Sequence, residues 1–416
     1  METPGVIIVG AGLTGATAAL TLREEGFTGS VTLVGAEPHL PYLRPPLSKG
    51  FLAGSEDEAS LAVAPPGGYA DAGIDVVLDQ RVLTVDTVLR RATLSDGRSL
   101  AYADLLLATG ASPRTLTLPG ATLDGVLTLR SLDDAKRMRG AITGSGDPST
   151  VRLVIVGAGW IGMEVAATAR ALGAAVTVVA PDAIPLAAAL GPQIGTLFAE
   201  RHARAGVGFR LDSRPRELIG QGGRVSGVRL ATGEALPADL VLIAVGATPN
   251  VELAASSGIA TDNGILVDQF LRTSTAHVYA AGDAASVYDP ALGGHQRNEH
   301  WANAIASGEA AARSILGTGS GLTAIPYFYT DQFDIGMEYS GYPSLARDAQ
   351  LIFRGEPGAG AYVAFWAVPE HDGRLIVVAG MSVNTWDVQD EIRELISSRR
   401  PVAPVELTRA PLPAAS

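Results

Sequence analysis

Two segments of the chain share one pattern of hydrophobic and polar positions: "VIIVGAGLTGATAA" from Val6 and "LVIVGAGWIGMEVA" from Leu153. Each has an apolar run, a glycine-rich turn and then small and apolar residues, and each leads to a second apolar run, "SVTLVGAE" or "AVTVVAPD". The pattern predicts a strand, a helix of about 12 residues and a second strand, which form a βαβ unit of a parallel sheet. The copies lie 147 residues apart (157 minus 10, counted between Gly10 and Gly157), so a whole domain is repeated.

Two shorter segments also resemble each other: "ADLLLATGASPR" at 103–114 and "ADLVLIAVGATPN" at 238–250. We expect the chain to leave one dinucleotide-binding domain at the first segment and to return at the second, so that the second βαβ unit is inserted into the first domain. After a Gly- and Ser-rich linker at 317–321, short aromatic runs predict antiparallel strands, and "DVQDEIRELISSR" predicts an amphipathic helix. The final "APLPAAS" is expected to lack regular structure.

Composition narrows the possible functions. The 416 residues are 47% hydrophobic and 18% charged, which is typical of a globular chain of two or three domains. No apolar run reaches the ~18–20 residues that span a bilayer, and the first residues lead directly into a strand, so we expect neither a membrane segment nor a signal peptide but a cytoplasmic protein. The chain has no cysteine, which excludes disulfides, Cys-ligated metal centres and thiol redox relays. A net charge of −12 disfavours nucleic-acid binding.

The first glycine-rich turn has the G-x-G-x-x-G spacing of a dinucleotide site. Gly10 suits the tight turn, Gly12 lets the backbone approach a pyrophosphate, and Gly15 lets helix and strand pack closely. Glu37, 22 residues past Gly15 (37 minus 15), is the candidate acid for ribose hydroxyls. A merely Gly-rich turn and a solvated glutamate are the simpler interpretations, but the strand–turn–helix–strand context favours the dinucleotide site.

Two further motifs favour a flavin. In "PYLRPPLSKG" three prolines fix the backbone and leave Arg44 and Lys49 as cations suited to an anionic cofactor, although a surface loop with incidental charge is also possible. In "VYAAGDAA" Asp283 stands at a strand end, just before an expected helix, where it could accept a hydrogen bond from a ribityl hydroxyl or simply cap that helix. Two Rossmann units together with this motif favour flavin.

The second turn holds Gly157, Gly159 and Gly162, followed by Glu164 on the expected first turn of the helix. That carboxylate could bond the carboxamide of a nicotinamide, or it could be an acid that the helix dipole favours. Trp301 stands at the start of another expected helix, either under the flavin or as a half-buried packing residue. No set of residues has the spacing of a metal site or a Ser/His/Asp triad.

The ordered motifs resemble the oxygenase-coupled, NADH-dependent ferredoxin reductases, which are FAD flavoproteins. These motifs are "VGAGLTG", "PYLRPPLSK", "ATGASPR", "VGAGWIGMEVA", "VGATPN", "VYAAGDAA", "HWANA", "PYFYTDQFD" and "VNTWDV". The RPPLSK loop together with the P-Y-F-x-x-D-Q segment is specific to this group within a wider disulfide-reductase-like superfamily, whose disulfide reductases need a redox cysteine that this chain lacks. The resemblance implies an α/β fold of glutathione-reductase-like architecture, with two Rossmann-type domains and a C-terminal α+β domain.

The resemblance also implies domain boundaries and site residues. An FAD-binding domain is expected at 1–113 and 240–318, an NADH-binding domain at 114–239 and an α+β domain at 319–416. FAD is expected to bind non-covalently and NADH to bind as a substrate. Lys49, Glu164 and Trp301 are implied as catalytic residues. The cofactor-binding residues are expected to be Gly10, Gly12, Thr14, Gly15, Ala36, Glu37, Arg44, Lys49, Val82, Ala108, Thr109, Gly110, Arg130, Gly157, Gly159, Ile161, Gly162, Glu164, Asp182, Gly246, Gly282, Asp283 and Trp301.

The implied activity is that of an FAD-dependent NAD(P)H:ferredoxin oxidoreductase. NADH would give a hydride to the flavin, and electrons would leave singly to a 2Fe–2S ferredoxin that serves a haem-thiolate monooxygenase (cytochrome P-450 type) or a Rieske dioxygenase. The alternatives are a rubredoxin reductase, a nitrite-reductase-type NADH flavoprotein, or a redox interaction protein of the apoptosis-inducing-factor kind, and the acidic composition argues against the last.

The chain departs from the family pattern at three positions. Ala36 stands where an acid usually follows Gly35, which leaves Glu37 to serve the adenosine ribose. Tyr329 replaces a tryptophan in the aromatic segment. Ala180 stands where an NADH site usually has glutamate, and we expect Asp182, 20 residues past Gly162 (182 minus 162), to bind the ribose 2′-OH instead. No arginine lies near Asp182 in the sequence to bind a 2′-phosphate, so NADH is favoured over NADPH.

Overall fold

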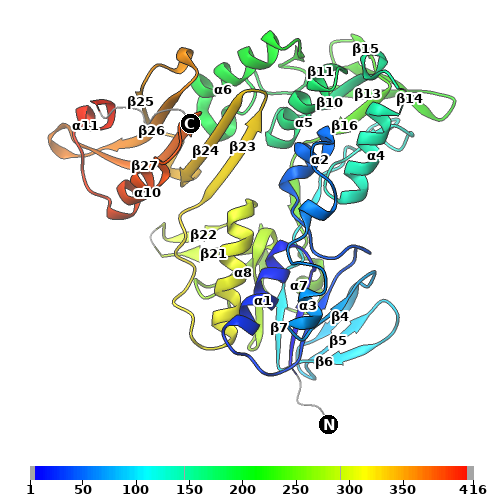
Figure 1. Cartoon of the computed structure of the whole chain (residues 1–416), viewed down its shortest axis with the longest axis vertical. Coiled ribbons are helices and arrows are strands. Elements are labelled where there is room, and N and C mark those ends of the chain that lie inside the picture. Colours follow the sequence, from blue (N-terminus) through cyan, green and yellow to red (C-terminus); the bar gives the residue numbers. More distant parts are fainter. Residues whose placement is uncertain (1–4, 145, 291, 410–416) are drawn as a thin grey trace. The chain divides into compact units, whose positions relative to one another are not determined.

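The computed structural model describes residues 5–144, 146–290 and 292–409 (Figure 1). The final "APLPAAS" lies outside these residues. The chain forms two compact units, each built from three segments. The first unit comprises Met1–Arg44, Glu58–Ser112 and Ala247–Pro326, and the second comprises Pro45–Asp57, Pro113–Gly246 and Tyr327–Ser416.

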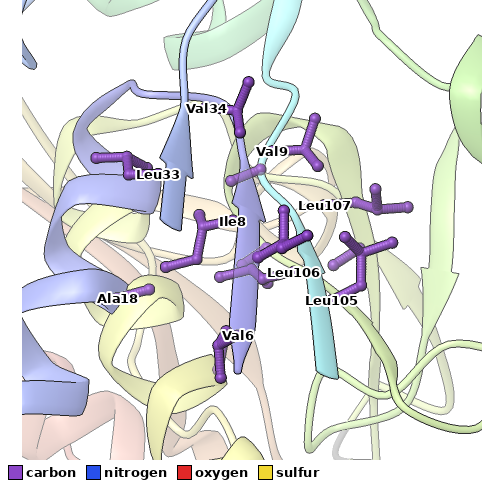
Figure 2. Close-up of a cluster of buried hydrophobic side chains, with 14 of the residues drawn as sticks. Val6, Ile8, Val9, Ala18, Leu33, Val34, Leu105, Leu106 and Leu107 are labelled. Carbon is purple, nitrogen blue, oxygen red and sulfur yellow. The ribbon is translucent and has the colours of Figure 1, made fainter. Parts of the chain in front are cut away.

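The first unit contains a parallel sheet of five strands in the order β20-β7-β1-β2-β3. The strands are β1 (Val6–Val9), β2 (Val31–Val34), β3 (Ile74–Val77), β7 (Asp104–Leu107) and β20 (Val278–Ala280). The side chains of the central strand β1 are buried on both faces, as expected when helices or other layers cover both sides of a parallel sheet (Figure 2). β1 pairs in register with β2 on one side and β7 on the other.

Two helices of the first unit pack closely against each other, α1 (Leu13–Glu24) and α8 (Trp301–Ile315) (Figure 1). Small residues allow the close approach, because a Cβ atom on Gly308 would lie 2.6 Å from the Thr14 carbonyl oxygen. The remaining elements are β4 (Val82–Asp86), β5 (Arg91–Leu94), β6 (Ser99–Ala101), β8 (Ala111–Pro113), β17 (Ala247–Pro249), β18 (Thr261–Asp262), β19 (Gly264–Val267), β21 (Ala285–Asp289), β22 (Gly294–Gln296), α3 (Gly68–Asp71), α7 (Glu252–Ser256) and the 3₁₀ turns Ala59–Leu61 and Gly282–Ala284.

The second unit contains its own parallel sheet, in the order β12-β11-β10-β16-β9. The strands are β9 (Val126–Leu127), β10 (Arg152–Val156), β11 (Ala175–Val179), β12 (Gly208–Arg210) and β16 (Leu240–Ile243). The sheet is accompanied by α4 (Leu132–Thr143), α5 (Trp160–Ala171), the 3₁₀ turn Pro148–Thr150 and α6 (Ala187–Arg204), which is interrupted at Gly191. The antiparallel strands β13 (Pro215–Gln221), β14 (Arg224–Leu230) and β15 (Ala235–Pro237) form a separate sheet. Both predicted βαβ helices, α1 and α5, have 12 residues.

The second unit also contains an antiparallel sheet in the order β23-β24-β27-β26-β25. Its strands are β23 (Tyr327–Gln332), β24 (Ile335–Gly341), β25 (Gln350–Arg354), β26 (Tyr362–Pro369) and β27 (Leu375–Val383). The helices α9 (Pro343–Ala346), α10 (Gln389–Ser398) and α11 (Pro404–Arg409), the 3₁₀ turns Pro357–Ala359 and His371–Gly373, and a loop with the 3₁₀ turn Pro45–Ser48 and α2 (Gly50–Ala53) complete the unit. Helix α10 buries Ile392, Leu395 and Ile396, which confirms the predicted amphipathic pattern.

The predicted fold class is therefore confirmed: two parallel sheets of Rossmann type, with antiparallel strands where the aromatic runs predicted them. The division into three domains stays a prediction. Within the described ranges, no helix is long and apolar enough to span a membrane.

His202 of α6 is a fully buried titratable group in the second unit. Its Nδ1 lies 2.9 Å from the Phe198 carbonyl oxygen, and its Nε2 lies 3.1 Å from the Met163 carbonyl oxygen. The ring also meets Phe333 edge-on, with 5.0 Å between the ring centroids. Burial lowers the pKa of His202 below its usual 6.5, although both carbonyls favour the charged form. The imidazole is therefore neutral at neutral pH.

We expect His202 to make the protein less stable in mild acid. Because its folded-state pKa is lowered, the unfolded chain binds a proton below about pH 6.5 that the native protein does not bind, which costs up to about 1.4 kcal/mol per pH unit. His202→Gln cannot titrate. The free energy of unfolding of the wild type, measured relative to this variant by denaturant titration at pH 7.5, 6.5 and 5.5, should fall as the pH is lowered. A difference that does not change with pH would contradict the assignment.

Candidate functional site

The glycine-rich turn of the first unit is locked in place by contacts between backbone atoms. Gly10 has φ +118°, and a Cβ atom there would lie 2.0 Å from the Ala108 carbonyl oxygen. A Cβ atom on Gly15 would lie 2.0 Å from the Gly10 carbonyl oxygen. At Gly12 a Cβ atom would meet nothing within 4 Å, and this residue begins α1 without a side-chain cap. The helix therefore offers uncapped N–H groups beside open space, as a bound pyrophosphate requires.

The turn of the second unit repeats this geometry almost atom for atom. Gly157 has φ +115°, and its Cβ atom would lie 2.2 Å from the Ala244 carbonyl oxygen. A Cβ atom on Gly162 would lie 2.2 Å from the Gly157 carbonyl oxygen, whereas Gly159 again faces open space and begins α5 without a side-chain cap. Each unit therefore has one helix N-terminus able to accept a phosphate group.

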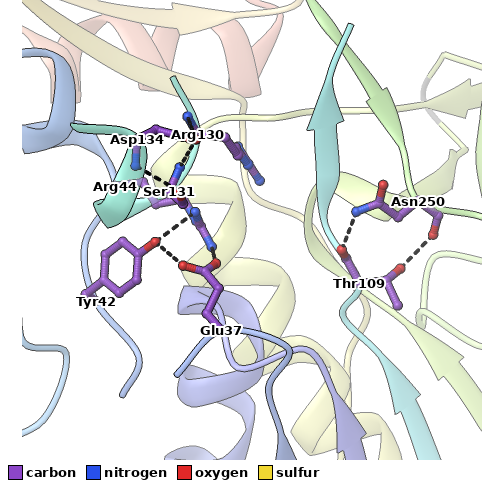
Figure 3. A network of polar contacts seen from close by, with 8 residues as sticks. All are labelled: Glu37, Tyr42, Arg44, Thr109, Arg130, Ser131, Asp134 and Asn250. Carbon is purple, nitrogen blue, oxygen red and sulfur yellow. Dashed lines mark hydrogen bonds and ion pairs between the residues drawn. The ribbon is translucent and has the colours of Figure 1, made fainter. Parts of the chain in front are cut away.

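Glu37 is held by two neighbours in the first unit (Figure 3). The Tyr42 hydroxyl donates to its Oε2 at 2.5 Å, and the Arg44 guanidinium donates to its Oε1 at 2.7 Å. Burial would raise the pKa of Glu37, but the charge of Arg44 and the two hydrogen bonds outweigh burial and lower it. Glu37 is therefore an ionised acceptor in a fixed position, as the predicted ribose contact needs, and Arg44 is joined to it.

Asp283 is buried in the first unit, but the helix expected directly after it is absent, and that expectation was wrong. The residue sits in a three-residue 3₁₀ turn that leads into β21. The turn packs on α1, because a Cβ atom on Gly282 would lie 2.5 Å from Thr14 Oγ1, and the Gly282 N–H donates to Ser307 Oγ at 3.0 Å. Burial would lower the pKa of Arg44, but Tyr42, Glu37 and Asp283 together raise it, so Asp283 and Arg44 influence each other electrostatically.

The predicted segment Ala108–Thr109–Gly110 is clamped by Asn250 (Figure 3). The Thr109 hydroxyl donates to the Asn250 carbonyl oxygen at 2.7 Å, and the Asn250 side-chain amide donates to the Thr109 carbonyl oxygen at 2.8 Å. The Asn250 N–H donates to the Gly110 carbonyl oxygen at 2.9 Å. The clamp lies where β8 pairs with β17, so the two predicted crossing segments do meet.

Three more predicted residues of the first unit are exposed or only half-buried. Ala36 is exposed at the turn before Glu37. Val82 is half-buried at the start of β4 and pairs with Leu94. Trp301 is the first residue of α8, and its side chain is exposed within the described structure.

In the second unit Lys49 and Glu164 form a buried ion pair, with 2.8 Å between Lys49 Nζ and Glu164 Oε2. The Ser48 hydroxyl donates to the same Oε2 at 2.5 Å, and the Thr330 hydroxyl donates to Oε1 at 2.6 Å. Glu164 lies past the first turn of α5, so its expected place on that turn was wrong, and the helix-dipole interpretation loses its basis. The structure therefore unites two predicted catalytic residues, Lys49 and Glu164.

Tyr329, which replaces the tryptophan of the family, contacts the same lysine. Lys49 Nζ lies 5.7 Å from the centroid of the Tyr329 ring, within cation–π range. Asp331 follows on the same strand, and burial raises its pKa, with Lys49 opposing and Glu164 adding to the effect. A half-buried group of charged side chains thus surrounds Lys49.

The region after β11 carries the predicted coenzyme-selecting acid, Asp182, which is exposed. Its carbonyl oxygen accepts from the Asp212 N–H at 3.3 Å. A hollow of about 320 Å³ opens beside it, lined by Pro181, Asp212, Ser213, Arg214, Ala231 and Thr232. Arg214 is remote from Asp182 in the sequence but lines the same hollow as Pro181, so folding brings an arginine into this region that the sequence argument did not include.

The remaining predicted residues of the second unit lie at loop and helix ends. Arg130 precedes α4, where its N–H donates to Asp134 at 3.1 Å beside the capping box that Ser131 and Asp134 form (Figure 3). Ile161 is exposed on the first turn of α5. Gly246 has φ +98°, and its carbonyl oxygen accepts from the Arg114 N–H at 2.9 Å. Among the residues with described positions, no cluster of histidine and acidic side chains could hold a metal ion.

Four residues that form hydrogen bonds with predicted site residues were not themselves predicted from the sequence: Tyr42, Ser48, Asn250 and Thr330. Tyr42 and Ser48 stand inside the "PYLRPPLSKG" motif, next to the cations that drew attention. Thr330 and Asn250 are distant in sequence from their partners, and only a contact between strands and helices reveals them.

The glycine geometry gives a prediction about folding alone. With bound ligand removed from both proteins, Gly12→Ala should have a melting temperature within about 2 °C of the wild type, because φ is −83° and the added methyl group has free space. Gly10→Ala should yield little folded protein, because the residue is left-handed and its methyl group would strike a carbonyl oxygen. Thermal unfolding of the purified variants checks both statements. Equal loss of stability in the two variants would contradict the geometry.

Known proteins support this picture. Residues 4–308 match the family described as pyridine nucleotide-disulphide oxidoreductase. Rhodocoxin reductase of Rhodococcus erythropolis is 36% identical over 399 residues, which cover 96% of this chain and 91% of that protein. The ferredoxin reductase for the CYP199A2 system from Rhodopseudomonas palustris superposes with a TM-score of 0.90 at 35% identity, covering 98% of this chain and 97% of the other.

A second solved structure, the covalent putidaredoxin reductase–putidaredoxin complex, matches with a TM-score of 0.89 at 31% identity, covering 98% of this chain and 96% of that one. These similarities confirm the predicted resemblance and the fold class. The chain belongs to the pyridine nucleotide-disulphide oxidoreductase family and is similar to the ferredoxin reductases within it.

Proposed function

We propose that this protein is an NADH-dependent ferredoxin reductase that binds FAD and passes electrons to a 2Fe–2S ferredoxin of an oxygenase system. The observation that carries the proposal is the pair of equivalent glycine-rich turns in a chain without cysteine. Two dinucleotide sites fit a flavin and a nicotinamide. Without a thiol pair the chain cannot pass electrons on through a disulfide of its own, and we propose that a separate carrier protein accepts them.

The first unit suits FAD. Gly12 leaves space for a pyrophosphate at the start of α1, and Glu37 is an ionised acceptor for a ribose diol. Buried Asp283 is a suitable acceptor for a ribityl hydroxyl, and Arg44 balances its charge. We propose non-covalent binding, because these contacts are all hydrogen bonds and charges.

The second unit suits NADH. Gly159 leaves space for its pyrophosphate at the start of α5, and we propose that Glu164 on the same helix accepts from the nicotinamide carboxamide. Lys49 forms an ion pair with Glu164, and a cation in this position would stabilise developing anionic character nearby. When bound, FAD supplies the two-electron oxidation of NADH and the one-electron delivery to the carrier. We propose that Lys49, Arg130 and Trp301 contact the flavin.

The partner follows from the relatives. Proteins similar to this chain include a rhodocoxin reductase, a ferredoxin reductase for a CYP199A2 system and a putidaredoxin reductase joined to putidaredoxin. We propose that the ferredoxin serves a haem-thiolate monooxygenase or a Rieske dioxygenase and that the protein works in the cytoplasm. The net charge of −12 makes nucleic acid an unsuitable partner.

The experiment for the proposal is a coupled assay. The purified protein should be yellow, and with NADH it should reduce cytochrome c at a rate that rises at least about tenfold when a suitable 2Fe–2S ferredoxin from a varied panel is added. Rubredoxins form a separate arm of the panel. NADH oxidation that no ferredoxin accelerates would refute the proposal, and acceleration by rubredoxin alone would favour the rubredoxin-reductase alternative.

Two glycine variants test which turn takes which ligand. Gly12→Ala should lose FAD, whereas Gly159→Ala should keep FAD and raise the KM for NADH about tenfold or more, because each methyl group fills the space meant for a pyrophosphate. The ratio of flavin to protein absorbance and the steady-state KM are the measurements. Loss of FAD from both variants, or from neither, would contradict the assignment of one ligand to each turn.

Asp182 tests coenzyme choice. We expect Asp182→Ala to raise the KM for NADH about three- to tenfold, because a hydrogen bond to the ribose 2′-OH is lost. Arg214→Gln is the matched control and should leave the KM for NADH unchanged. If Asp182→Ala has no effect, Asp182 is only a turn residue. If the wild type uses NADPH well and Arg214→Gln abolishes that use, the hollow beside Pro181 binds the 2′-phosphate and NADH is not the preferred coenzyme.

A further inference from the structure

We propose that Thr330 is a positioning residue that fixes the Glu164 carboxylate for the nicotinamide, with its own hydroxyl oriented by Gln332. This inference rests on the proposed function, since it concerns the residue assigned to the nicotinamide. Thr330 adds a contact from the C-terminal antiparallel sheet to the surroundings of Glu164. The other residues there come from the βαβ unit proposed to bind NADH and from the RPPLSK loop.

Both carboxylate oxygens of Glu164 are already engaged within the second unit. Oε2 accepts from the Ser48 hydroxyl at 2.5 Å and pairs with Lys49 Nζ at 2.8 Å. Oε1 has one donor among the contacts of the described residues, the Thr330 hydroxyl at 2.6 Å. Glu164 is 5% exposed and Thr330 is 1% exposed, so water cannot easily replace that donor. Without Thr330, Oε1 would be a charged oxygen in a dry site with its donor missing, which is costly.

Gln332 determines which way the Thr330 hydroxyl points. Its Nε2 donates to Thr330 Oγ1 at 3.1 Å, so the hydroxyl oxygen is occupied as an acceptor and its hydrogen is free for Glu164. If the Gln332 amide were reversed, its oxygen would compete with Glu164 for the one hydroxyl hydrogen. The carboxylate charge therefore selects the orientation of the amide.

The orientation of the Gln332 amide costs it a hydrogen bond, which indicates that this orientation has a function. Gln332 is 1% exposed, and its buried Oε1 has no hydrogen-bond partner among the described residues. A buried polar atom left without a partner is uncommon in folded proteins and needs an explanation. Here the amide gives up a bond at Oε1 and keeps the donor on Thr330, which in turn keeps the donor on Glu164. The series of hydrogen bonds from Gln332 to Thr330 to Glu164 therefore accounts for the unpartnered Oε1.

Strand β23 holds this series of hydrogen bonds in place. Thr330 and Gln332 are two residues apart on β23, so their side chains leave the same face of the sheet. Backbone pairing with β24 fixes them opposite Met337 and Ile335. Because β23 also packs against α5, the sheet holds Glu164 from outside its own helix. A side chain held in this way loses little freedom when it binds a ligand, which favours a precise contact.

Three variants at position 330 test the proposal. Thr330→Val keeps the shape and removes the hydroxyl, Thr330→Ser keeps the hydroxyl and removes the methyl group, and Thr330→Ala replaces Thr330→Val if the latter does not fold. The holoprotein is used throughout. The measurements are the anaerobic rate of flavin reduction at saturating NADH, the dissociation constant of ADP-ribose, the melting temperature, and the ¹³C signal of the Glu164 carboxyl carbon, assigned with Glu164→Gln.

In Thr330→Val we expect the saturating rate to fall about tenfold, while ADP-ribose, which lacks the nicotinamide, binds within about twofold of the wild type. The Glu164 carboxyl signal should shift in Thr330→Val. In Thr330→Ser the rate should stay within about threefold of the wild type and the signal should stay near its original position.

Three results would overturn the proposal. An unchanged rate and carboxyl signal in Thr330→Val would mean that the hydroxyl is idle. Equal damage in Thr330→Ser and Thr330→Val would mean that the methyl group matters, which is a packing role. Loss of ADP-ribose affinity in step with the rate would mean a general distortion of the unit. Failure of the proposed function is seen separately, because the wild type would then lack FAD or would not be reduced by NADH.

Discussion

The structure depends on one close contact that occurs twice: the third glycine of each turn lies directly against the carbonyl oxygen of the first. At Gly15 and at Gly162 this contact leaves no space even for a methyl group. It brings the start of a helix against the end of a central strand, so the helix N-terminus faces the carboxyl edge of the sheet. That contact sets α1 against β1 and α5 against β10, and it thereby positions both proposed dinucleotide sites.

The contact also explains what could be predicted from the sequence. Glycine spacing, apolar runs and helix length are local properties, so the two βαβ units, the antiparallel strands and the amphipathic helix of 389–398 all followed from pattern. The surroundings of Asp283 did not follow, because the choice between a helix and a single 3₁₀ turn is made by packing on α1 through Thr14. Thr330 and Ser48 could not be found from spacing, because they reach Glu164 from 166 and 116 residues away.

The group around Lys49 shows how a buried charge is made tolerable. An isolated ammonium and carboxylate away from water would be costly, but here hydroxyl groups from two other elements complete the carboxylate and an aromatic ring faces the ammonium. Lys49 is one of only two lysines in a chain that otherwise uses arginine. A compact ammonium fits beside a carboxylate oxygen that already accepts from a serine, whereas a planar guanidinium binds most strongly when both carboxylate oxygens are open to it.

The pairing of β8 with β17 has a consequence for how the chain folds. Arg114 donates to the Gly246 carbonyl oxygen, so the segment between them begins and ends one hydrogen bond apart. Once that segment has folded, bringing β7 and β20 together requires closing a loop of the remaining 37 residues (108–113 and 247–277) rather than of all 170 residues at 108–277. Because a hydrogen bond joins the two ends of the inserted segment, the insertion adds little loop-closure entropy to the formation of the sheet that it interrupts. The segment that carries the second parallel sheet can therefore interrupt the sequence of the first unit.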